Sequence, residues 1–168
     1  MNDFLDGIES HIPALRRYAR ALTGNADAAD DLVQDCLERA IRKQGLWKRD
    51  TNLKAWLCTI LLNLFRNDKR RQKKARFEPL DTPGADPAQA PAQPGRLALA
   101  EISRAIARLP DEQREALLLV VLEGTSYAEA AGMLSIPIGT LMSRLGRARA
   151  NLRTMTGEAG EPRLRAVK

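Results

Sequence analysis

Apolar residues recur every three or four positions along most of the chain, which is the spacing that lines one face of an α-helix. The pattern contains no clear strand-like alternation and therefore predicts an all-α fold. Asn25 or Asp27 is expected to cap the second helix and Asn52 the third, while Pro13 should break or kink the first. The predicted helices cover residues 4–22, 25 to about 43, 53 to beyond 70, 97–109, 110–124, 127–134 and 139–152.

The segment from Glu78 to Gly95 has a different composition, with five of the nine prolines, three acidic residues and no basic residue. Such a composition is typical of an extended linker. We therefore expect two small helical domains, at residues 1–76 and 97–153, joined by a flexible linker at 77–96 and followed by a flexible tail at 154–168. Because such a linker permits many arrangements, the sequence does not predict how the free domains sit relative to each other.

The last two predicted helices have the features of a helix-turn-helix. Ser126 and Glu129 form the S-x-x-E capping box that starts a helix. Ser135-Ile136-Pro137 should end that helix, and a second begins at about Gly139 or Thr140. The second helix carries arginines and no acidic residue, as a helix that enters the DNA major groove does. The plainer alternative is a three-helix bundle with a basic face.

The final helix has distinct apolar and polar faces. Its apolar face, expected to pack against Leu117, Val121 and Leu134, holds Ile138, Leu141, Leu145, Ala148 and Leu152. Arginine can bind guanine through two hydrogen bonds, and threonine or serine can bind phosphate or base. The outward face, which we expect to meet DNA, holds Gly139, Thr140, Ser143, Arg144 and Arg147.

Charge supports a nucleic-acid partner. The chain holds 27 Lys plus Arg against 21 Asp plus Glu, and the stretch from Arg66 to Arg76 alone has a net charge of +6. Such a stretch attracts phosphate, although an acidic membrane surface competes and a single basic run is often a solvated helix end. No apolar run is long enough to insert into a membrane, and the acidic N-terminus lacks a signal-peptide core. We therefore expect a cytoplasmic protein.

The sequence offers little for catalysis. Cys36 and Cys58 fall at or beside apolar helical positions and are expected to be buried free thiols. With His11 as the single histidine and no Cys-x-x-Cys motif, we expect no metal site and no cofactor. No phosphate-binding glycine loop or acid–base constellation is present, so we do not expect an enzyme.

Two parts of the chain together resemble an extracytoplasmic-function (ECF) RNA polymerase sigma factor. Region 4 of that family, which binds promoters, resembles LPDEQREALLLVVLEGTSYAEAAGMLSIPIGTLMSRLGRAR, and its region 2 resembles ADDLVQDCLERA followed by LKAWLCTILLNLFRNDKRR. The resemblance covers about residues 12–74 and 99–153, in the family's order. It implies a factor that binds core RNA polymerase and directs promoter recognition, DNA melting and transcription initiation. It also implies a stress or envelope response and control by an anti-sigma factor.

The resemblance also implies roles for individual positions. The family's second helix binds core polymerase, here through Asp31, Gln34, Asp35 and Glu38. The third helix and the basic run melt and hold the minus-ten element, here with Asn63, Arg66, Asn67, Lys69, Arg70 and Arg71. The helix-turn-helix reads the minus-thirty-five element, here through Gly139, Thr140, Ser143, Arg144 and Arg147.

Several positions depart from the family pattern. Met142 replaces a polar residue, Ser135 the usual turn glycine, and Leu62 a frequent basic residue. Fewer polar groups on the last helix favour reading of DNA shape. Gly146 should weaken that helix by about 1 kcal/mol relative to alanine.

Two other functions remain open at this point. A sigma-like decoy would titrate an anti-sigma factor without transcribing, but the intact basic run and the arginines of the last helix argue against it. A helix-turn-helix repressor would need a dimer surface or a ligand pocket to match a palindromic site.

Overall fold

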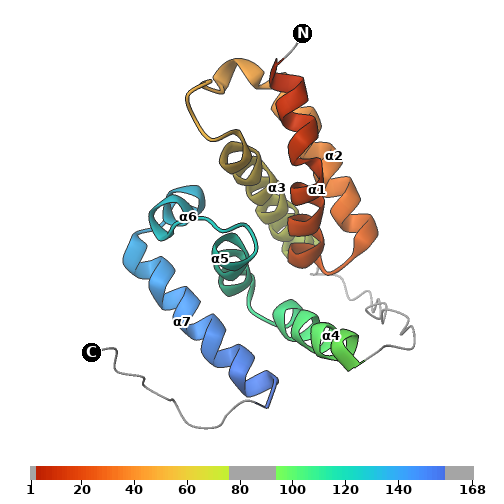
Figure 1. The fold of residues 1–168 in the computed structure, drawn as a ribbon, viewed down its shortest axis with the longest axis vertical. Coiled ribbons are helices and arrows are strands. Elements are labelled where there is room, and N and C mark those ends of the chain that lie inside the picture. The colour runs from red at the N-terminus through yellow and green to blue at the C-terminus, as the bar shows by residue number, and fades with distance from the viewer. Residues whose placement is uncertain (1–2, 76–93, 158–168) are drawn as a thin grey trace.

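The computed structural model describes residues 3–75 and 94–157. Across these residues the chain forms seven α-helices and one short 3-10 helix, with no strand, which confirms the all-α prediction (Figure 1). The N-terminal domain consists of α1 (Asp3–Thr23), α2 (Ala26–Arg42), the 3-10 helix η1 (Gln44–Leu46) and α3 (Leu53–Ala75). The C-terminal domain consists of α4 (Pro94–Ala107), α5 (Asp111–Val121), α6 (Tyr127–Leu134) and α7 (Ile138–Met155).

Two asparagines cap helices of the N-terminal domain. The Asn25 side chain accepts a hydrogen bond from the Ala28 amide at 3.0 Å, so Asn25, and not Asp27, caps α2. The Asn52 side chain accepts one from the Ala55 amide at 3.2 Å, as the sequence predicts for α3.

Of the two outcomes expected at Pro13, a break does not occur, because α1 runs continuously from Asp3 to Thr23. Phe4 and Ile8 are buried before the proline, and Leu15 and Tyr18 are buried after it. Pro13 itself is exposed, so water can reach the backbone carbonyl that loses its helical partner. Burial of apolar side chains on both sides therefore outweighs the missing hydrogen bond.

The helix-turn-helix forms as predicted, with two differences of detail. Leu141, Leu145 and Ala148 are buried where α7 packs against α5. Ile138 and Val121, expected in the same core, are 49% and 67% exposed. They are the first residue of α7 and the last of α5, where the neighbouring helix no longer covers them.

The turn between α6 and α7 contains a strained residue. Ser135 has a φ of 54°, the left-handed conformation that glycine adopts without a steric cost. This strain explains why the usual residue here is glycine. Gly124, which follows α5, also has a positive φ of 66°.

Replacing Ser135 with glycine is expected to raise the free energy of unfolding by about 0.5–1 kcal/mol, because it removes the steric cost of this conformation. Urea denaturation followed by circular dichroism measures the change. Gly124→Ala is the matched control and should lower the free energy by about 1 kcal/mol, since an added Cβ there meets open space but keeps the strained φ. A destabilised Ser135→Gly variant would contradict the assignment.

The two domains contact each other. Helix α1 contacts α4 and α5, and α3 contacts α6 (Figure 1).

Residues 94–96 of the expected linker belong to α4, and α7 extends to Met155, past the expected domain end. The rest of the expected linker and the tail from residue 158 lie outside the described residues.

Candidate nucleic-acid interface

Helix α7 exposes three of the five expected DNA-reading positions. Gly139, Ser143 and Arg147 are exposed, whereas Thr140 and Arg144 are half-buried. Arg144 Nη2 lies 3.6 Å from Glu112 Oε2 of α5, and the Glu112 side chain is 72% exposed. An ion pair with so exposed a partner is weak. The Arg144 side chain itself is 19% exposed, so neighbouring residues cover most of it.

Helix α3 carries a second basic face. The exposed positions of the expected minus-ten set are Asn63, Asn67, Arg70 and Arg71. The ammonium of Lys69 lies 5.5 Å from the centroid of the Phe65 ring, a cation–π distance, which ties its side chain to the helix surface. We call Lys69, Arg70 and Arg71, in the half of α3 that leads to Ala75, the basic strip, which Asn63 and Asn67 precede on the same helix.

Arg66 is oriented differently from its neighbours on α3. Its Nε and Nη2 atoms donate hydrogen bonds to Glu115 Oε2 of α5, at 3.1 and 2.9 Å. The Glu115 side chain is 4% exposed and the Arg66 side chain 26% exposed. This residue of the expected minus-ten set is therefore bound to the C-terminal domain.

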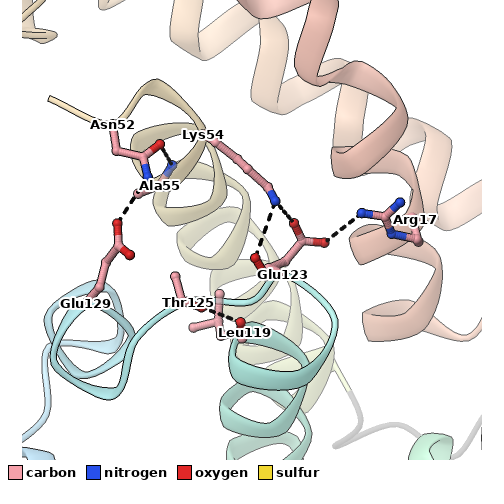
Figure 2. A network of polar contacts seen from close by, with 8 residues as sticks. All are labelled: Arg17, Asn52, Lys54, Ala55, Leu119, Glu123, Thr125 and Glu129. Atoms are coloured by element: carbon pink, nitrogen blue, oxygen red, sulfur yellow. Dashed lines mark hydrogen bonds and ion pairs between the residues drawn. The ribbon is translucent and has the colours of Figure 1, made fainter.

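A second ionic contact joins the domains at Glu123, whose side chain is 2% exposed (Figure 2). Lys54 Nζ of α3 lies 2.7 Å from Glu123 Oε2, and Arg17 Nη2 of α1 lies 3.8 Å from Glu123 Oε1. We call Arg17, Lys54 and Glu123 the Glu123 cluster. Its two cations balance a carboxylate that is removed from water.

The two residues of the capping box before α6 bind different partners. The Ser126 hydroxyl accepts a hydrogen bond from the Glu129 amide at 3.2 Å, as the motif predicts. The Glu129 carboxylate instead accepts a hydrogen bond from Asn52 Nδ2 of α3, at 3.3 Å (Figure 2). One element of the expected motif therefore contributes to the domain contact.

A small cavity of about 190 Å³ lies at the domain contact. Its lining includes Cys58 and Lys54 from α3, and Glu123 and Glu129 from the C-terminal domain. Cys36 and Cys58 are both free and buried, which confirms that prediction. Burial raises the pKa of each thiol to about 12, and the carboxylate of Glu123 also raises that of Cys58. Both thiols are therefore protonated at neutral pH.

These raised pKa values predict a loss of stability in alkali. The unfolded thiol ionises near its ordinary pKa of 9.0, whereas the folded thiol stays protonated until about pH 12. The stabilising contribution is complete below pH 9 and is lost between pH 9 and 12, about 1.4 kcal/mol per thiol by pH 10. Urea denaturation at pH 8 and pH 10 should show a smaller pH dependence in Cys58→Ala than in the unchanged chain. Thr59→Ala, a neighbour that does not titrate, should keep the full pH dependence.

The expected polymerase-binding positions lie on the solvent-exposed face of α2. Asp31, Gln34, Asp35 and Glu38 are all exposed. Glu38 forms an exposed ion pair with Arg42 one turn later, at 3.8 Å. This acidic face belongs to α2, which packs against α3.

Sequence reasoning missed Arg17, Lys54, Glu115 and Glu123, which form the ionic contacts between the domains. One signal was present, because Glu115 directly precedes the apolar run Ala116–Val121. An acidic residue beside a buried run needs a cationic partner. The sequence alone does not identify which cation supplies it.

Within residues 3–75 and 94–157, no group of three or more metal-ligating side chains is placed to hold an ion. No helix in that part of the chain is long and apolar enough to cross a membrane.

Each of the two domains matches a known protein family. Residues 8–62 match the family described as the sigma2 domain of PhyR, and residues 99–152 match sigma-70 region 4. The ECF RNA polymerase sigma factor EcfG of Rhodopseudomonas palustris is 43% identical over 150 residues, which cover 88% of this chain and 81% of EcfG.

Solved structures show the same likeness. The sigma factor RpoE, in complex with the anti-sigma factor NepR from Bartonella quintana, matches with a TM-score of 0.78 and 34% identity. That match covers 95% of this chain and 100% of RpoE. The anti-anti-sigma factor PhyR, complexed with NepR from Bartonella quintana, shares the fold at a TM-score of 0.60 and 20% identity, over 88% of this chain and 48% of PhyR. The order of the two matched regions and the identity to EcfG over most of both chains lead to one conclusion: this chain belongs to the family of ECF RNA polymerase sigma factors.

Proposed function

We propose that this sigma factor binds core RNA polymerase and gives it promoter recognition, strand opening and transcription initiation. The observation that carries the proposal is the presence of both matched regions in one chain, the first leading into the basic half of α3 and the second including most of α7. The polymerase supplies the catalysis, so this chain contributes recognition and needs no cofactor. Its place of work is that of the polymerase, the cytoplasm.

The C-terminal domain would bind the minus-thirty-five element through α7. Gly139 and Ser143 are exposed and without bulky side chains, which permits close approach of the DNA. Thr140 is suited to phosphate or base, and Arg144 and Arg147 supply the cationic contacts.

The N-terminal domain would hold the melted minus-ten strand along α3. Asn63 and Asn67 lie on the same exposed face and can bond base edges, while Arg70 and Arg71 continue the positive strip for the backbone. Lys69 and Arg66 belong to this set by their positions. In the arrangement described above, Arg66 contacts Glu115 instead.

The acidic face of α2 would bind core polymerase. Asp31, Gln34, Asp35 and Glu38 are exposed on one helix and are not needed for the packing of the domain. They lie on a different helix from the basic strip of α3, so binding of polymerase and of DNA would use different side chains.

We also propose that an anti-sigma factor controls this chain, in a stress or envelope response. The support is the RpoE structure, which contains NepR and matches 95% of this chain. The expected partner is an anti-sigma factor similar to NepR.

Run-off transcription tests the proposal. The full chain is added to bacterial core RNA polymerase on genomic fragments of its own host, and the transcript starts are mapped. We expect discrete starts that share two upstream elements and that vanish with Asn67→Ala. Absence of both core binding and transcripts would overturn the proposal.

A decoy for an anti-sigma factor is the second candidate function. It is favoured by the match of residues 8–62 to the sigma2 domain of PhyR, which is itself described as an anti-anti-sigma factor. The decoy would bind an anti-sigma factor with no dependence on Arg144 and Arg147, and it would give no transcripts with core polymerase.

A further inference from the structure

The first turn of α5 contains two acidic residues that contact different partners. Asp111 accepts a hydrogen bond from Arg114 Nη2 at 2.5 Å, within the same helix. Glu112 instead lies beside α7, where its Oε2 atom is 3.6 Å from Arg144 Nη2. Acidic residues in a first turn complement the helix dipole, and Asp111 fulfils this role as well. The helix dipole therefore does not explain why the Glu112 carboxylate lies beside an arginine of α7.

The packing of α5 on α7 fixes the place of Glu112 relative to Arg144. The two helices pack against each other, and Leu145 of α7 is buried in the core that they share. The next residue of α5, Gln113, accepts a hydrogen bond from Asn151 Nδ2 of α7 at 2.7 Å. Arg144 and Asn151 are about two helical turns apart. Two adjacent residues of α5 therefore contact α7 at separate points, which holds the backbone of Glu112 beside Arg144.

A carboxylate at this place changes what Arg144 can bind. Neighbouring residues cover most of the Arg144 side chain, and its Nη2 atom meets the exposed side chain of Glu112. A DNA phosphate on Arg144 would bring a second negative charge beside the Glu112 carboxylate, and the two charges repel each other. The edge of a guanine carries no net charge and offers the acceptors O6 and N7. Because a guanidinium has several N–H donors, Arg144 can contact Glu112 and bind guanine at the same time.

We propose that Glu112 is a positioning residue that directs Arg144 to a guanine of the minus-thirty-five element and disfavours binding of Arg144 to phosphate. Glu112 acts through the guanidinium of Arg144 and does not itself bind the base. This role rests on the proposed function, because it requires that α7 reads promoter DNA. It adds to the DNA interface a residue of α5, which lies outside the helix-turn-helix.

The test compares the base preferences of variants of the full chain bound to bacterial core RNA polymerase. The probe is a library of double-stranded promoters built on a start site mapped with the unchanged chain. The upstream element is randomised, and transcripts are counted by sequencing. Arg144→Ala first identifies the base pair at which a preference for guanine is lost.

We expect Glu112→Gln to lower the preference for guanine at that base pair about threefold, which is the size of effect that an exposed ion pair gives. The same variant should raise transcription from library members that lack this guanine, because it removes a negative charge close to DNA phosphates. A residue that only stabilised the fold would lower transcription from all members alike.

A double-mutant cycle separates the ion pair from a general effect of charge. In an Arg144→Ala chain, Glu112→Gln should have no further effect on the preference at this base pair. Glu101→Gln is the matched control, since it removes an exposed carboxylate from α4 of the same domain, and it should leave the preference unchanged. Circular dichroism of each variant should show unchanged helix content.

An unchanged guanine preference in Glu112→Gln would overturn the proposal, as would an equal loss of transcription from every library member. The proposal also fails if Arg144→Ala alters no base preference, because Arg144 then contacts only the DNA backbone. It fails again if Glu112→Gln has the same effect with and without Arg144. If the unchanged chain gives no start site at all, the proposed function itself is wrong, and the role of Glu112 is rejected with it.

Discussion

Replacing both Arg144 and Arg147 with alanine is expected to lower transcription from the factor's own promoter about 30-fold or more. A good bidentate arginine–base contact contributes about 1–3 kcal/mol of discrimination, so two lost contacts amount to at least about 2 kcal/mol. Arg147 is exposed on α7, and Arg144 is held only by a weak ion pair with the exposed Glu112. Run-off transcription at a fixed concentration of polymerase measures the loss.

Arg153→Ala provides the control for this prediction. Arg153 is exposed in the last turn of the same helix, far from its N-terminal half, and its loss removes one positive charge of the same kind. We expect a small effect that disappears at higher salt, because it acts through general attraction of phosphate. A loss as large as that of the double variant would show that α7 acts through charge alone and would contradict base reading.

Replacing Leu145 with alanine is expected to lower the free energy of unfolding by about 3–4 kcal/mol. Leu145 is 1% exposed in the middle of α7, in the core that this helix shares with α5. A domain of about 60 residues has a small free energy of unfolding, so the helix-turn-helix should lose its cooperative unfolding transition in this variant. Circular dichroism during urea denaturation measures this.

Met142→Ala is the matched control for Leu145→Ala. Met142 lies one turn earlier on the same helix, and 54% of it is exposed. Its truncation should change the free energy of unfolding by less than about 0.5 kcal/mol. Similar losses for both variants would contradict the assignment of the buried and exposed faces of α7.

The helices were predictable because their signals are local. The caps at Asn25, Asn52 and Ser126 each depend on residues three positions apart, and the sequence shows both partners. The end of α6 was predictable from Pro137, which restricts Ile136, whereas the left-handed φ of Ser135 was not predicted. The continuity of α1 through Pro13 was harder to predict, because it depends on how much apolar surface the two halves of the helix bury together.

The contact between the domains was not predictable from local signals. Arg66 and Glu115 are 49 positions apart, and Lys54 and Glu123 are separated by 69. Helical periodicity relates positions three or four residues apart, so it gives no register for such pairs. Family resemblance assigned Arg66 to DNA, and only the fold places it beside Glu115.

The covalent connection between Ala75 and Pro94 determines how readily a competitor can displace this contact. Two sites on one chain meet at an effective concentration that can reach the order of millimolar, whatever the amount of protein in the cell. A ligand that is present at nanomolar concentration therefore needs a high affinity for Arg66 to displace this internal contact. Affinities measured on separated domains would overstate the access that the intact chain offers, because they omit this internal competitor.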